Sequence, residues 1–187
     1  MAGASNPRGA IRHTASSQSN ISSHQEGKVT ADRPRYTGIR KYTDQDGGYG
    51  LWFPSSWHQI PIAEGHQGVI FAPQAEHAHT SFAAEKHTLP FKVSQKDVII
   101  LRKGFQAGLE SLPEVIIESQ EESITATLKI FEAHVTFVED GVRRKRWVRT
   151  SYWGEAQLTL IAQGATEEEF ERYEGMFYNT MMTVAIE

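Results

Sequence analysis

The sequence contains no cysteine in its 187 residues. This absence excludes disulfides, thiolate nucleophiles, zinc held by thiolates, iron–sulfur clusters and the lipid-bearing cysteine of lipoproteins. Long apolar runs are also lacking, because none approaches the roughly 18 to 20 residues that span a bilayer. The N-terminus shows no apolar core of a secretory signal. We therefore expect a soluble chain with no membrane span and a cytoplasmic localisation.

A surplus of positive charge is lacking too, since the formal net charge is −4 and the sequence pI is about 6.1. Proteins that bind nucleic acid usually carry a basic surplus, so nucleic acid is not the expected partner. The sequence has no phosphate-binding loop, no dinucleotide fingerprint and no nucleophile elbow. We predict no catalytic residue and no cofactor, and a non-enzymatic function is favoured although an enzyme is not excluded.

The first 35 residues are rich in serine and have almost no periodic apolar residues. Such a segment cannot offset the entropy of ordering, so we expect residues 1–35 to be a disordered polar tail. The tail has five basic residues and two acidic ones, and none of the acidic residues precedes Glu26. An acid-poor start is also typical of an organelle transit peptide, which gives an organelle as the alternative localisation. Residues 36–187 are expected to form a single domain.

The body of the chain reads as strand-rich, with two helices. Runs of β-branched and aromatic residues between turn signals predict strands at 37–43, 49–53, 69–72, 81–87, 115–118, 123–139, 142–153, 158–162 and 183–186. One helix is predicted at 95–111, where a capping box of Ser94 and Asp97 begins an apolar periodicity. A second capping box, Thr166 with Glu169, begins a helix with its apolar stripe at Phe170, Tyr173, Phe177 and Met181. Gly104 and Gly108 are expected to pack the first helix closely on the sheet.

The segment from Tyr49 to Trp57 is a short aromatic strand that Pro54 ends, with a second tryptophan just beyond it. With the helix that ends near Pro113, the Asp140-Gly141 hairpin and the C-terminal helix, it resembles the opening of the PsbP-like superfamily. Members of that superfamily include PsbP, the DcrB lipoproteins and a Ran guanine-nucleotide release factor. The resemblance implies an α+β fold with an antiparallel sheet of about six or more strands between helices, an α/β/α sandwich. In that arrangement the neighbours Trp52 and Phe53 point to opposite covered faces, and both are expected to be buried.

The resemblance implies binding or assembly roles without a common active site. A photosystem role would come with a lumenal targeting segment, and the DcrB type is a lipoprotein, whereas this chain shows neither an apolar signal core nor a cysteine. A related group of cytosolic secretion chaperones, which bind apolar segments of exported toxins, needs neither feature. The leading hypothesis is therefore a non-enzymatic adaptor or assembly chaperone that binds a protein partner through its sheet face or hairpin edge. The sequence does not identify the partner or the oligomeric state.

A basic ribbon, which we define as residues 143–149, follows the Asp140-Gly141 turn. Strand alternation places Arg144 and Arg146 on one face, and the opposite face receives Arg143, Lys145, Trp147 and Arg149, the predicted partner-binding residues. Such a face is suited to an acidic partner, phosphate or RNA. The alternative is that the ribbon only keeps an exposed hairpin soluble, with Glu132 and Glu139 neutralising it across the strands. The register is open, since a two-residue turn pairs Phe137 with Arg144 and a bulged turn pairs it with Arg143.

Histidines supply the remaining candidate chemistry. His77 and His79 flank Ala78 beside Glu76, but a metal site needs three or four converging ligands. The sequence does not place His58, His66 or His87 next to them, so we predict no metal and keep His77 and His79 as weak candidates. A small enzyme or ligand-binding protein with a cleft lined by His58, His77 and His79 is the alternative function. Phosphate or RNA binding through the basic ribbon is the second alternative.

Overall fold

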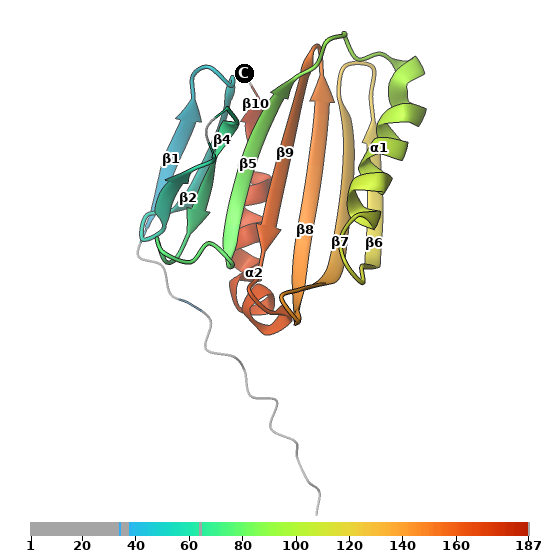
Figure 1. Ribbon diagram of the computed structural model, residues 1–187. Helices are drawn as coiled ribbons and strands as arrows, with labels where there is room; N and C mark the ends of the chain where they lie inside the picture. Colours follow the sequence, from blue (N-terminus) through green and yellow to red (C-terminus); the bar gives the residue numbers. More distant parts are fainter. Residues whose placement is uncertain (1–33, 35–37, 64, 187) are drawn as a thin grey trace, which may run out of the picture. The chain divides into compact units, whose positions relative to one another are not determined.

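The computed structural model describes residue 34 and residues 38–63 and 65–186 (Figure 1). The predicted tail, residues 1–35, lies outside these residues except for Pro34. The remaining chain forms two antiparallel sheets and two α-helices. In the described part of the chain, neither helix is long and apolar enough to cross a membrane.

The main sheet has seven strands, all antiparallel to their neighbours, in the order β3-β4-β5-β9-β8-β7-β6. Their bounds are β3 His58–Pro61, β4 Gln67–Ala72, β5 Ser81–Thr88, β6 Ile116–Ile124, β7 Lys129–Glu139, β8 Val142–Trp153 and β9 Ala156–Gln163. A smaller sheet, in the order β1-β2-β10, consists of β1 Ile39–Asp44, β2 Tyr49–Pro54 and β10 Ala185–Ile186. The C-terminal segment therefore returns to pair with the aromatic strand β2.

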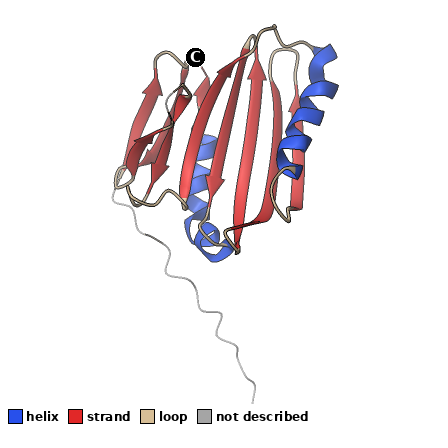
Figure 2. Ribbon diagram, viewed as in Figure 1, coloured by secondary structure: helices blue, strands red, loops and turns tan. Residues whose placement is uncertain are grey.

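The two helices lie on opposite faces of the main sheet, as Figure 2 shows. Helix α1, Val98–Glu110, follows a 3-10 turn, η1 Gln95–Asp97, and packs on β7 and β8 through Leu101, Phe105 and Leu109. Helix α2, Glu167–Met182, covers the other face together with the small sheet, and its Phe170 and Phe177 are fully buried there. This arrangement confirms the predicted α+β class, an antiparallel sheet flanked by helices.

The β7–β8 hairpin takes the two-residue turn. Phe137 pairs with Arg144, and Glu139 pairs with Val142 on either side of Asp140-Gly141. Both turn residues have positive φ, 52° for Asp140 and 74° for Gly141, as a type I′ turn requires. The register fixes which side chains of the basic ribbon face each helix.

Several element boundaries differ from the sequence prediction, among them that of β6, which extends to Ile124 where a strand at 115–118 was predicted. The predicted strand at 123–139 is broken by a turn at 125–128, where Thr125 N–H donates to Leu128 O at 2.8 Å. Lys129 begins β7 fully buried, with its ammonium donating to Ala126 O at 2.8 Å. The helix predicted at 95–111 starts as the 3-10 turn η1, and the short strand β3 was not predicted. Short polar strands such as β3 carry little period-two signal, so pattern reading misses them.

The expected burial of Trp52 is wrong, although that of Phe53 is right. Phe53 is 3% exposed and stacks on Phe71 with ring centroids 4.0 Å apart, whereas Trp52 is 41% exposed. The difference arises because β2 belongs to the small sheet instead of the main one. Trp52 is the one exposed residue of β2 and points away from its buried neighbours Leu51 and Phe53.

The expected close packing of Gly104 and Gly108 is also wrong. A Cβ atom built on either residue meets no neighbouring heavy atom within 4 Å. Close approach is instead found at Gly68 in β4, where a Cβ would lie 2.3 Å from the carbonyl oxygen of Ala84. The two glycines of α1 therefore border open space beside the sheet.

Candidate functional site

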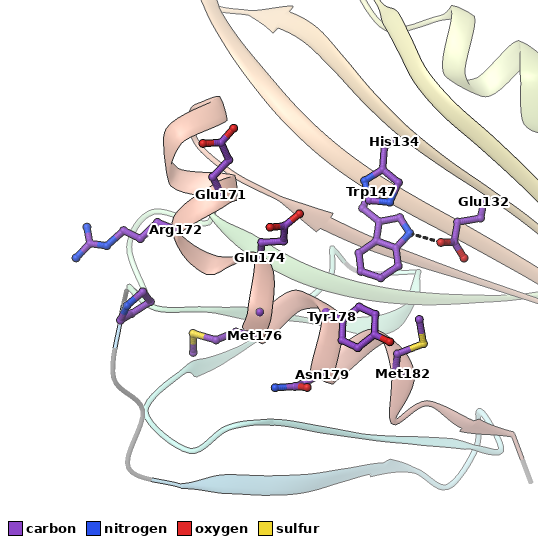
Figure 3. A pocket seen from close by; sticks show the side chains of 12 residues that line it. Glu132, His134, Trp147, Glu171, Arg172, Glu174, Met176, Tyr178, Asn179 and Met182 are labelled. Carbon is purple, nitrogen blue, oxygen red and sulfur yellow. Dashed lines mark hydrogen bonds between the residues drawn. The ribbon is translucent and has the colours of Figure 1, made fainter. Parts of the chain in front are cut away.

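A groove of about 660 Å³ lies between α2 and the strands β7 and β8 (Figure 3). We call it the α2 groove. From the sheet it is lined by Glu132, His134 and Trp147, which point toward the helix. From α2 it is lined by Glu171, Arg172, Glu174, Gly175, Met176, Tyr178, Asn179 and Met182. These eight of the sixteen residues of α2 lie on the side of the helix that faces the groove, while Phe170 and Phe177 face the core.

Three stacked rings form the wall of the α2 groove. His134 and Trp147 are directly paired across β7 and β8, and their rings stack at 4.9 Å with an interplanar angle of 21°. Trp147 stacks in turn on Tyr178 of α2 at 6.2 Å and 25°. The indole is almost fully buried, whereas Tyr178 is 53% exposed. The stack thus runs from the sheet to the surface and ends in an accessible phenol ring.

The carboxylate of Glu132 holds this wall in place. One oxygen accepts a hydrogen bond from Trp147 Nε1 at 2.8 Å, and the other accepts from Arg149 Nε at 2.6 Å. Arg149 also donates from Nη1 to the carbonyl oxygen of Met181 at 3.3 Å. Charge-assisted bonds of this kind are short and strong, so the indole orientation and the end of α2 are fixed together.

The setting of His134 favours the neutral form of its ring. Burial lowers the pKa of His134 below its usual range, and the nearby Lys145 lowers it further, while Glu132, Glu118 and Glu174 act in the opposite direction. Desolvation is the largest of these causes, because the imidazole lies between Trp147 and the edge of Phe170. A neutral imidazole stacks as an aromatic ring and adds no charge to the groove.

The charged side chains of the α2 groove that have no ion-pair partner among the described residues are negative. Glu171 and Glu174 on α2 form no ion pair with any other described residue. Arg172, the groove's one cation in the described part of the chain, lies 3.5 Å from Glu169 and over the ring of Tyr173. These two carboxylates therefore make the electrostatic potential at the rim of the α2 groove negative.

A second, more apolar groove of about 310 Å³ adjoins the first. It is lined by the exposed side chains of Ile39 and Trp52 from the small sheet and by Thr183 beyond α2. Met176 and Asn179 line both grooves, so the two share a boundary along α2. Exposed apolar side chains consequently flank the C-terminal half of α2 on both sides, with Tyr178 and Met182 on the first side and Trp52 and Ile39 on the second.

The predicted partner-binding residues all point to the face that carries the α2 groove, but only Trp147 lines it. Their cations are engaged within the protein. Lys145 Nζ lies 3.0 Å from Glu118, Arg143 lies 3.7 Å from Glu114, and Arg149 is held by Glu132. On the opposite face, Arg144 is buried and lies 3.1 Å from Glu139 and 2.8 Å from His79 Nδ1. The basic ribbon is therefore largely neutralised by carboxylates.

The predicted histidine candidates lie away from this groove. His77 and His79 are exposed in the segment between β4 and β5, and His58 begins β3. The structure instead gathers His66 and His87 on Glu85, with nitrogen–oxygen distances of 2.7 Å and 3.2 Å. Within the described residues, no three His, Asp or Glu side chains are placed so that they could hold a metal ion.

No family model and no curated protein matches this sequence. Solved structures do match it. Cyanobacterial PsbP (CyanoP) from Synechocystis sp. PCC 6803 is 14% identical, with a TM-score of 0.57 over 80% of this chain and 92% of that one. The chain has the PsbP-like fold.

Two further structures share this fold. LpqN of Mycobacterium tuberculosis, described as involved in cell envelope biogenesis, is 16% identical, with a TM-score of 0.53 over 79% of this chain and 91% of that one. A protein from Bacteroides thetaiotaomicron is 14% identical, with a TM-score of 0.53 over 79% of this chain and 48% of that one. At these identities the PsbP-like likeness concerns the fold alone.

Sequence reasoning missed His134, Tyr178 and Glu174 as groove residues. The hairpin register would have paired His134 with Trp147, but two registers were open before the turn was known. Tyr178 and Glu174 reach the groove only because α2 docks across β8 and β9, and local sequence does not encode that docking.

Proposed function

We propose that this protein is a non-enzymatic binding module that holds a segment of a partner protein in the α2 groove. The partner segment carries an aromatic or apolar side chain flanked by lysine or arginine. The observation that carries the proposal is the wall of stacked rings, His134, Trp147 and Tyr178, which ends at the surface beside free carboxylates.

Aromatic rings held rigidly at a surface are typical of protein-binding sites. They offer large contact areas and lose little side-chain entropy on binding. Here the Glu132 carboxylate already fixes the indole of Trp147, so the wall needs no ordering when a partner arrives. Tyr178 supplies the accessible end of the stack, and Met182 beside it is flexible enough to adapt to a side chain.

The charge of α2 selects the partner. Helix α2 contains five glutamates and one arginine, and Glu171 and Glu174 at the groove have no ion pair among the described residues. A basic segment would satisfy these carboxylates, whereas an acidic segment or a nucleic acid backbone would be repelled. The alternative of phosphate or RNA binding through the basic ribbon has less support, because Arg143, Lys145 and Arg149 are already paired with glutamates.

A defined peptide panel tests the proposal. Fluorescent peptides with one tryptophan or leucine between lysines would be titrated against the full chain, beside peptides in which glutamate replaces each lysine. We expect the basic aromatic peptides to bind and the acidic ones to fail. Tyr178→Ala and the double variant Glu171→Lys/Glu174→Lys should each weaken binding by about tenfold or more.

The control is Glu155→Lys, because Glu155 is an exposed carboxylate in the β8–β9 turn outside the α2 groove. Binding by the Glu155→Lys variant should match that of the unchanged chain. Equal binding of basic and acidic peptides would contradict the proposal. So would an equal loss of peptide binding in Glu155→Lys and in the double variant Glu171→Lys/Glu174→Lys.

A further inference from the structure

A separate groove of about 400 Å³ lies on the opposite face of the main sheet, between α1 and the strands β8 and β9. We call it the α1 groove. Its middle is apolar, with Phe105 and Leu109 from the helix and Val148 and Ile161 from the sheet. Groove volumes of about 300 to 1,000 Å³ are typical of small-molecule sites.

Two glycines keep the helix side of the α1 groove open. Gly104 and Gly108 lie one turn apart in α1, line the groove, and have no atom within 4 Å of the position of a Cβ. A glycine inside a helix is unfavourable relative to alanine. The packing of this protein does not require them, since a Cβ at either position would meet no neighbouring atom. Their effect is to leave space between the helix and the sheet.

Arg146 supplies a positive charge at one end of the groove and forms no ion pair with another described residue. Its guanidinium donates from Nε to Gln163 Oε1 at 2.8 Å and lies 4.5 Å from the ring centroid of Phe137. Among the described residues no carboxylate lies within ion-pair distance of Arg146, because Glu139 is taken by Arg144 at 3.1 Å. Burial lowers the pKa of Arg146, which reflects the cost of keeping this cation partly out of water; Arg144 lowers it further, while Glu139 acts in the opposite direction.

The other end of the groove is polar but uncharged. Thr150 and Thr159 lie opposite each other on β8 and β9, with their hydroxyl oxygens 3.3 Å apart, beside Gln157. Arg146, Val148 and Thr150 point to the same face of β8, and four residues of strand place the Cα atoms of Arg146 and Thr150 roughly 13 Å apart. The groove thus presents a cation, then an apolar stretch, then hydroxyl and amide groups.

We propose that the α1 groove binds an amphipathic carboxylate, a medium-chain fatty acid, with its carboxylate on Arg146 and its alkyl chain along Val148, Ile161 and the glycine face of α1. The guanidinium matches a carboxylate in charge and geometry, and binding would place a carboxylate at ion-pair distance from Arg146, where no described residue provides one. An acidic peptide fits less well. Both β8 and β9 are inner strands whose backbone groups pair on both sides, so a peptide backbone would find no partners in the groove. An alkyl chain has no polar groups to satisfy.

The test uses decanoate, with 1-decanol as the uncharged counterpart, titrated by calorimetry against the full chain. We expect saturable decanoate binding at a single site, and binding of decanol weaker by about tenfold or more. Arg146→Gln should weaken decanoate binding by a similar factor and leave decanol binding unchanged. Gly108→Leu should abolish the binding of both decanoate and decanol, because the leucine side chain would occupy the apolar stretch of the groove. Gly104→Leu is a second variant that should fill the same groove.

Matched controls come from α2. Gly175→Leu places the same side chain at a helix glycine that also has open space but lines the α2 groove, and Arg172→Gln removes an exposed arginine there. Both variants should bind decanoate like the unchanged chain. Absence of decanoate binding below its critical micelle concentration would overturn the proposal. Equal losses of decanoate binding in Gly175→Leu and Gly108→Leu would also overturn it. The same holds for an Arg146→Gln variant that folds and binds decanoate as tightly as the unchanged chain.

Discussion

Arg149 of β8 and Glu132 of β7 face each other directly across the hairpin, with Arg149 Nε 2.6 Å from Glu132 Oε2. Less than a fifth of either side chain is exposed. The same carboxylate accepts the indole N–H of Trp147, and the same guanidinium reaches the end of α2 at Met181. This pair therefore connects the sheet, the aromatic wall of the α2 groove and the C-terminal end of the helix.

Charge reversal at Arg149 should destabilise the fold. A glutamate at this position would face Glu132 at close range in a partly buried setting, so we expect Arg149→Glu to lower the free energy of unfolding by about 3 kcal/mol. Arg143→Glu is the matched control, because Arg143 lies 3.7 Å from the well-exposed Glu114 and its loss should cost less than about 1 kcal/mol. Urea unfolding of the two variants gives the comparison, and equal costs would mean that the Arg149–Glu132 pair contributes no more than a surface pair.

Neighbouring aromatic residues of β2 should differ sharply in their effect on stability. Phe53 is buried against Phe71, so Phe53→Ala should cost about 3 to 5 kcal/mol, as large deletions in packed cores do. Trp52 is 41% exposed, so Trp52→Ala should cost about 1 kcal/mol. Thermal and urea unfolding measure both values. A cost for Trp52→Ala near that of Phe53→Ala would show that the outer face of the small sheet is covered in solution.

Local signals in the sequence predicted the features that depend on a few adjacent residues. The N-terminus of α2 is one example, because the Thr166 side chain accepts a hydrogen bond from the Glu169 N–H at 3.1 Å, as a capping residue does. The Asp140-Gly141 turn is another, since both residues adopt the positive φ that this dipeptide favours. The order of the elements was enough to predict the α+β fold class.

Features that depend on tertiary packing were not predictable in the same way. The exposure of Trp52 follows from the division of the strands into two sheets, and alternation along β2 does not reveal that division. The engagement of Lys145 by Glu118 depends on the register of β6, where a bulge lies between Ile117 and Ser119. The α1 and α2 grooves depend on where each helix lies on the sheet. A single sequence gives only the apolar stripe by which a helix packs.

Alanine at the glycines of α1 should stabilise the protein. Since a Cβ at Gly104 or Gly108 meets no atom within 4 Å, each substitution should gain up to about 1 kcal/mol from helix propensity alone. Gly68→Ala is the contrasting variant, because its Cβ would lie 2.3 Å from the Ala84 carbonyl oxygen and the β4–β5 pairing would have to shift. Urea unfolding would measure these differences in stability as shifts of the midpoint, provided that the dependence of the unfolding free energy on urea concentration stays the same. Destabilisation by Gly104→Ala would mean that α1 packs more closely on the sheet than described.

The buried imidazole of His134 should make the stability of the protein sensitive to acid. Burial lowers the pKa of His134 in the folded state, whereas the unfolded chain takes up a proton near the ordinary value of about 6.5. Below about pH 6.5 the unfolded state therefore binds a proton that the folded state resists, and the free energy of unfolding falls as the pH falls. Above about pH 7.5 both states are mostly neutral at this residue, so its titration contributes little there.

Replacing His134 with glutamine removes this titration, so His134→Gln should lose less stability than the unchanged chain between about pH 7 and about pH 5. The difference between the two proteins should be nearly constant above about pH 7.5, where it reports mainly the loss of stacking on Trp147. His77→Gln, at an exposed position between β4 and β5, controls for histidine removal as such. Urea unfolding across this pH range gives the profiles. A constant difference between His134→Gln and the unchanged chain at all pH values would show that His134 is protonated as readily in the folded protein as in the unfolded chain.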